Sequence, residues 1–118
     1  MRQEGAGELE GIDIAFLSLN PDIHQDLISS LEQRGDRVHV NPLLELPCKT
    51  DLILIEASFS YFKIFKFLKR LQTRESTACV LLMGPDLRSD RMSALLRGGV
   101  FDYLKTPFPL QRLGKAIQ

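Results

Sequence analysis

Three short apolar segments constrain the fold of this chain more than any other feature. They are IDIAFLS (12–18), LILI (52–55) and CVLLM (79–83). Parallel strands that are covered by helices on both faces have this composition, whereas half-exposed strands alternate apolar and polar residues. We therefore predict that these segments form the centre of a parallel β-sheet. Two more polar segments, RVHV (37–40) and VFDYL (100–104), are expected nearer its edges.

Helical patterns separate these strands. The first predicted helix begins after Asn20, a good capping residue, with Pro21 at its first position, and Gly35 ends it. The others start near Tyr61, at Asp86 and at Pro109. The residues expected to face the core are Ile23, Leu27, Ile28 and Leu31, then Tyr61, Ile64, Phe65, Leu68 and Leu71, then Met92, Leu95 and Leu96 before the glycines 98–99, and last Leu110, Leu113 and Ile117.

The link between the second and third strands is unusually short. NPLLELPCKT (41–50) has ten residues, whereas a parallel crossover normally needs a dozen or more, so its helix should be stunted. The repeated β-α pattern predicts an α/β fold, a three-layer sandwich. Its five-stranded parallel sheet should have the flavodoxin-like strand order 2-1-3-4-5.

Length and composition indicate one domain. The chain has 118 residues, of which 44% are hydrophobic, which is enough for a compact core without crosslinks. We expect this domain over residues 12–118. Residues 1–11 are too polar and acidic for a signal peptide and are expected to form a flexible leader. Cys48 and Cys79 lack metal-ligand spacing, so we expect reduced thiols in a cytoplasmic protein.

Charge and hydropathy exclude some partners. Fifteen basic and fifteen acidic side chains cancel, so no overall field attracts nucleic acid or an anionic membrane. No apolar run reaches the roughly 18 residues that a membrane span requires. The basic face of the helix predicted near Tyr61 carries Lys63, Lys66, Lys69 and Arg70. It could dock an acidic partner or nucleic acid, or simply be solvated.

In such a sheet the functional site lies beyond the carboxyl ends of the strands, where the strand order reverses. No glycine-rich loop follows the first strand, so a nucleotide or flavin site there is unsupported and we predict no cofactor. His24 is expected on a helix surface. The residues that should lie at this edge are Ser18, Leu19 and Asn20, then Glu56, Gly84 and Thr106.

Four segments resemble one family. IAFLSLNPDI, DLILIE, VLLMGPD and GGVFDYLKTPF follow one another as in the receiver domains of bacterial two-component response regulators, over nearly the whole chain. The spacing from Glu56 to the KRL of residues 69–71 fits receivers without a gap, and DYLKTPF resembles their ending DYLxKPF. In the order and spacing of these segments, the sequence resembles a receiver domain.

The resemblance also implies that every reactive position has changed. Receivers bind Mg²⁺ through two acids after the first strand and phosphorylate an aspartate after the third. They use a hydroxyl residue after the fourth strand and a lysine after the fifth. Here these positions are Ser18 and Leu19, Glu56, Gly84, and Thr106, while Tyr103 matches the switch aromatic. We therefore predict a degenerate receiver with no catalytic residues and no metal, which is not an enzyme.

The prediction for Glu56 has two alternatives. Its longer carboxylate could mimic a phosphoryl group by placing a fixed charge where that group would lie, or it could be a strand-end acid that faces water. One carboxylate without a metal, a lysine or a hydroxyl has nothing to offset the charge that develops in phosphoryl transfer. The sequence predicts no phosphorylation in either case.

The predicted function is a phosphorylation-independent protein interaction or dimerisation module in bacterial signalling or transcription regulation. Its partner would be its own effector domain, a second copy or a signalling protein. The alternative is a flavodoxin-like sensor of a small ligand or cofactor in the same cleft, which an open cleft would favour and a plug by Leu19 or Met83 would disfavour. The interaction face that the resemblance implies contains Arg88, Arg91, Lys105, Arg112 and Lys115.

Overall fold

The computed structural model describes residues 11–44, 50–57, 59–74, 77–85 and 88–106. Five parallel strands form one sheet in the order β2-β1-β3-β4-β5, which confirms the predicted flavodoxin-like arrangement. The strands are β1 (Asp13–Leu17), β2 (Arg37–Asn41), β3 (Leu52–Glu56), β4 (Cys79–Gly84) and β5 (Asp102–Lys105).

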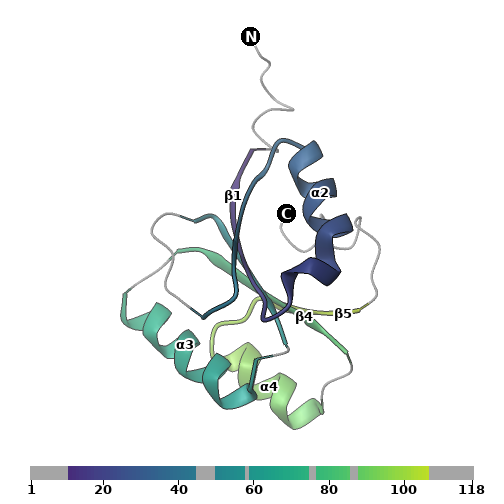
Figure 1. The fold of residues 1–118 in the computed structure, drawn as a ribbon. Helices are drawn as coiled ribbons and strands as arrows, with labels where there is room; N and C mark the ends of the chain where they lie inside the picture. Colours follow the sequence, from purple (N-terminus) through teal and green to yellow (C-terminus); the bar gives the residue numbers. More distant parts are fainter. Residues whose placement is uncertain (1–10, 45–49, 58, 75–76, 86–87, 107–118) are drawn as a thin grey trace.

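Helices cover both faces of the sheet. A 3₁₀ turn, η1 (Pro21–His24), leads into α2 (Gln25–Gln33), and the later helices are α3 (Tyr61–Thr73) and α4 (Ser89–Arg97). Figure 1 shows α3 and α4 together on one side of the sheet and α2 on the other. Right-handed crossovers explain this division, because β1 to β2 runs one way along the sheet while β3 to β4 to β5 runs the other way.

The central strands have the two buried faces that their apolar composition predicts. In β3, Leu52 and Leu54 belong to the core on the α2 side, while Ile53 and Ile55 belong to the core on the α3 side. All four are at most 1% exposed. Alternation along the strand therefore assigns Glu56, the next residue, to the α2 side of the sheet.

Three predicted helix faces need correction. Ile23 is 65% exposed, because η1 winds three residues per turn and shifts the phase of the stripe that was predicted for an α-helix. Phe67 is fully buried although it was not in the predicted stripe, and Leu96 is 43% exposed although it was predicted to face inward. The predicted helix that opens at Pro109 lies outside the described residues, as do Asp86 and Cys48.

The connection after β2 shows no helix in its described residues 42–44 and 50–51, which agrees with the predicted stunting. A right-handed crossover places this connection on the α3 side of the sheet. Its described residues form no helix that would cover β2 on that side. The β2 residues that point to this side are accordingly polar. Arg37 Nε donates to Asp13 Oδ1 at 2.7 Å, and this hydrogen bond holds the pKa of Asp13 below its usual value.

A buried carboxylate fixes the start of β1. Asp36, which follows α2 and is 4% exposed, accepts hydrogen bonds from the backbone N–H groups of Gly11 and Ile12 at 3.0 and 3.3 Å. Gly35 takes a φ of 98° in the preceding turn, a conformation that favours glycine. The predicted end of the first helix at Gly35 is thus confirmed.

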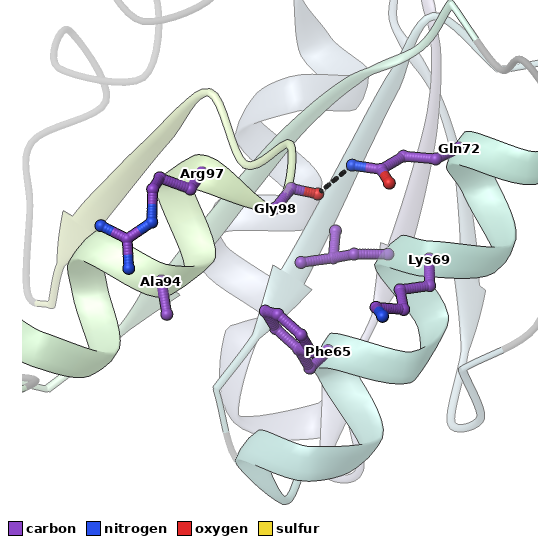
Figure 2. A pocket seen from close by; sticks show the side chains of 7 residues that line it. Phe65, Lys69, Gln72, Ala94, Arg97 and Gly98 are labelled. Atoms are coloured by element: carbon purple, nitrogen blue, oxygen red, sulfur yellow. Dashed lines mark hydrogen bonds between the residues drawn. The ribbon is translucent and has the colours of Figure 1, made fainter.

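The glycines after α4 also end that helix, as predicted. Figure 2 shows the Gln72 side chain of α3 reaching Gly98, where Nε2 donates to the carbonyl oxygen at 2.8 Å. This bond satisfies one of the carbonyls left open at a helix end. Among the described residues, no helix is both long and apolar enough to cross a membrane.

Candidate functional site

The carboxyl ends of the strands meet at one edge of the sheet. The Ser18 N–H donates to the Asn41 carbonyl at 3.1 Å, Ala57 donates to Met83 at 2.8 Å, and Thr106 donates to Gly84 at 2.7 Å. The backbone therefore brings together the strand ends that carry the predicted site residues.

Both carboxylate oxygens of Glu56 accept hydrogen bonds from side chains. Ser18 Oγ donates to Oε1, and His24 Nε2 donates to Oε2 at 2.9 Å. The hydroxyl of Ser18 also accepts the N–H of Asn20 at 3.0 Å. Ser18 is fully buried, and the side chains of His24 and Glu56 are only 17% and 14% exposed. We call Ser18, His24 and Glu56 the Glu56 cluster.

Three elements position the Glu56 cluster. Strand alternation turns Ser18 and Glu56 to the α2 side, and η1 carries His24 over the same edge. The ring of Phe16 meets the ring of His24 edge to face, with centroids 5.5 Å apart. The prediction that His24 is a helix-surface residue was wrong. The sequence has no signal that distinguishes this 3₁₀ turn from an ordinary helix start, so His24 could not be placed at the site from the sequence.

The position of Gly84 has no room for a side chain. A Cβ on Gly84 would lie 2.7 Å from the Tyr103 hydroxyl and 2.8 Å from the Ala57 Cβ, both well inside van der Waals contact. Tyr103 is 8% exposed, and its hydroxyl donates to the Pro85 carbonyl at 2.5 Å. The ring of Tyr103 therefore lies in the core, and its hydroxyl fills the space beside Gly84.

Neither of the two predicted plugs closes the cleft. Leu19 is 54% exposed, and Met83 is buried in the core on the α2 side. The described groups in this region are the Glu56 cluster on the α2 side of the sheet and Tyr103 with Ala57 on the α3 side. Thr106 is half-buried at the end of β5.

The donor set of this edge does not fit Mg²⁺. The ion prefers octahedral oxygen ligands with one or two carboxylates, and the Glu56 cluster offers one carboxylate whose two oxygens already accept hydrogen bonds. Within the part of the chain that the structure describes, no three His, Cys, Asp or Glu side chains are grouped so that they could hold a metal ion.

The predicted interaction face is partly described. Arg88 and Arg91 of the α4 region and Lys105 at the end of β5 are exposed, while Arg112 and Lys115 lie outside the described residues. Arg88 pairs with Asp90 at 2.9 Å, and the guanidinium of Arg91 lies over the Tyr61 ring at 5.1 Å. We call Arg88, Arg91 and Lys105 the α4-β5 face.

Comparison with known proteins identifies the fold. No protein-family model and no curated protein matches the chain, but many solved structures do. A two-component response regulator from Clostridium difficile is 24% identical over 90% of this chain and 94% of its own, with a TM-score of 0.77. The non-phosphorylated HemR receiver domain from Leptospira biflexa is 17% identical over 91% and 94%, with a TM-score of 0.76.

A third structure with the same fold is described as a pilus assembly protein. A putative CpaE2 pilus assembly protein from Sinorhizobium meliloti is 19% identical over 90% of this chain and 97% of its own, with a TM-score of 0.66. All three cover nearly the whole chain, and two of them are described as a response regulator and a receiver domain. The chain therefore has the receiver fold of response regulators.

Proposed function

We propose that this chain is a degenerate receiver of bacterial signalling that acts without phosphorylation, as a protein interaction or dimerisation module. One observation carries the proposal: both carboxylate oxygens of Glu56 accept hydrogen bonds from protein side chains. A phosphoryl acceptor needs an oxygen that is available for attack and cations that offset the developing charge.

The Glu56 cluster favours a third role for Glu56, beside the phosphate mimic and the strand-end acid. Its side chain is only 14% exposed, and Ser18 and His24 donate to its two carboxylate oxygens. We infer that the role of Glu56 is structural, because its hydrogen bonds connect the end of β3 to the residue after β1 and to η1. A mostly buried acceptor with two donors stabilises the fold without supplying chemistry.

The packing around Gly84 supports the same proposal. In the receivers that the chain resembles, a hydroxyl residue at this position moves with the phosphoryl group, and the switch aromatic responds to that movement. Here the Tyr103 hydroxyl occupies the space beside Gly84 and donates to the Pro85 carbonyl. Tyr103 thus has a fixed partner that does not depend on phosphorylation.

The sensor alternative receives less support. A ligand in the predicted cleft would need space between Ser18, Glu56 and Gly84, where the contacts of the Glu56 cluster and of Tyr103 leave side chains packed together.

We keep residues 12–118 as the proposed domain and residues 1–11 as its leader. The proposed partner is an effector domain, a second copy or another signalling protein, and it meets the α4-β5 face.

The proposal is tested by treating the full chain with acetyl phosphate and Mg²⁺. Intact-mass spectrometry should show no phosphoryl adduct, and analytical ultracentrifugation should give the same mass distribution with and without the treatment. A phosphoryl adduct on the unmodified chain, or a treatment-dependent change in association, would contradict the proposal.

A further inference from the structure

We propose that a groove beside α3 binds an acidic amphipathic helix of a partner protein. The groove has a volume of about 530 Å³. Its lining includes no residue of the Glu56 cluster or of the α4-β5 face, although Leu19 directly follows Ser18. We call it the α3 groove, and its lining residues are Leu19, Leu43, Leu44, Phe59, Lys63, Lys66 and Arg70.

The topology explains why a groove exists at this place. The crossover from β2 to β3 passes over β1 on the α3 side, where a parallel β-α-β unit normally lays a helix. The described residues of that crossover form no helix, and Leu43 and Leu44 line the groove instead. The α3 groove therefore lies along the described start of this crossover.

The floor of the α3 groove is apolar. Phe59 is 6% exposed and belongs to the core on the α3 side, against which Leu44 also packs. Leu19 and Leu43 are 54% and 55% exposed, which is high for large apolar side chains that lie together. Covering them would remove apolar surface from water and so favour binding.

One wall of the α3 groove is a row of cations. Lys63, Lys66 and Arg70 are three and four residues apart on α3, so they share one helix face and span about 10 Å along its axis. All three are exposed, and none forms an ion pair with an acidic group of the described residues. Arg70 instead donates to the Leu44 carbonyl at 3.2 Å.

These two features specify the occupant. An inorganic anion would leave the apolar floor uncovered, and one fatty acid carboxylate would meet only one of the three cations. A helix with an apolar stripe and a flanking row of Asp or Glu presents both properties with the same spacing of three and four residues. Charge complementarity between the carboxylates and the cation row would set the orientation of that helix.

This inference rests on the proposed function in one respect, that the domain works by binding protein. The two can fail separately. A phosphoryl adduct on Glu56 would overturn phosphorylation independence without touching the α3 groove, and a chain that binds no acidic helix would lose the groove proposal while its phosphorylation result stood.

The probe is a labelled synthetic helix of about 16 residues, or four turns, with leucines on one stripe and glutamates on its flank. Fluorescence anisotropy with the full chain at low salt should give saturable binding that weakens as salt rises. Two control peptides separate the forces. One replaces the glutamates by lysines and the other replaces the leucines by serines, and both should bind much more weakly.

Matched variants place the site. We expect the double variant Lys63→Glu, Lys66→Glu to weaken probe binding about tenfold or more, since it reverses two groove cations. Lys69→Glu is the charge control, because Lys69 lies on the same helix but lines a separate pocket towards α4. Leu43→Ser should also weaken binding, whereas Leu96→Ser on α4 should not.

The single variant Lys66→Glu matches Lys69→Glu in charge. The proposal is overturned if Lys69→Glu weakens probe binding as much as Lys66→Glu does, because binding would then follow net charge. It is also overturned if the lysine peptide binds as well as the glutamate peptide. Saturable binding of decanoate in the absence of any probe binding would assign the groove to a small amphipathic anion instead. Circular dichroism of each variant verifies that its fold is retained.

Discussion

His24 Nε2 lies 2.9 Å from Glu56 Oε2 and joins the turn after β1 to the end of β3. Both side chains are mostly buried, so this contact replaces water on the carboxylate. The alternative of a strand-end acid that faces water does not describe this carboxylate, which is only 14% exposed, whereas the phosphate mimic stays a prediction.

Replacing His24 by alanine should lower the free energy of unfolding by about 1 to 3 kcal/mol, because Glu56 loses a partner in a mostly buried site. Urea unfolding measures this change. His39→Ala is the matched control and should have little effect, since the side chain of His39 is 71% exposed. A double-mutant cycle with Glu56→Gln should show coupling, and strict additivity would mean that the His24–Glu56 contact does not stabilise the fold.

Glu56→Asp should not gain a phosphoryl group from acetyl phosphate and Mg²⁺. The shorter acid restores the nucleophile of receivers but leaves Ser18 and Leu19 in place of the metal-binding acids, and Thr106 in place of the lysine. Each missing charge-stabilising group typically costs about a hundred- to a thousandfold in rate. Intact-mass spectrometry detects the adduct.

The informative comparison is a four-site variant with Ser18→Asp, Leu19→Asp, Glu56→Asp and Thr106→Lys. It restores both metal-binding acids and the lysine, although Gly84 still supplies no hydroxyl. An adduct on Glu56→Asp alone would show that the site is less degenerate than its residues indicate.

Gly84→Ala should destabilise the domain by about 1 to 3 kcal/mol, because the new Cβ overlaps the Tyr103 hydroxyl and the Ala57 methyl group. Thermal or urea unfolding measures the loss. The same substitution should cost less in a Tyr103→Phe background, where the clash with the hydroxyl is gone and the clash with Ala57 remains. An equal cost in both backgrounds would argue against the packing described for Tyr103.

The Asp13–Arg37 pair should make stability depend on acid pH. The hydrogen bond from Arg37 lowers the pKa of Asp13 from 3.8 in the folded state, so its contribution is present above that value and is lost as the pH falls through the folded pKa. The difference in urea midpoint between the unmodified chain and Asp13→Asn should therefore shrink below about pH 4. A difference that stays constant from pH 6 to pH 2 would contradict this.

Arg91→Glu should weaken self-association or partner binding through the α4-β5 face by about 1 kcal/mol or more. Analytical ultracentrifugation measures self-association. Lys66→Glu on α3 is the control and should leave self-association unchanged, since Lys66 lies in the α3 groove. Equal effects of the two reversals would remove the reason to prefer the α4-β5 face.

The sheet could be predicted because its signal is local. Segments such as Leu52–Glu56 are apolar at every position but the last, and burial on both faces places such strands in the interior of the sheet. The same reasoning placed Glu56 and Gly84 at one edge of the sheet, where the structure has them.

The contacts inside the site could not be predicted, because they depend on tertiary packing. The 3₁₀ turn that carries His24 to Glu56 has no sequence signal distinct from an ordinary helix start. The fit of the Tyr103 hydroxyl beside Gly84 joins residues on two strands and is a matter of shape. Phe67 was missed because the buried stripe of α3 is rotated towards Phe67 and away from Tyr61 and Phe65, which are only partly buried.

Two contacts join α4 to α3, one at each end of α3. Arg91 lies over the ring of Tyr61 at the start of α3, and Gly98 accepts the Gln72 side chain near its end. Sliding α4 along the sheet would break both contacts at once. The helix that carries the α4-β5 face is thereby joined at two points to the helix that walls the α3 groove.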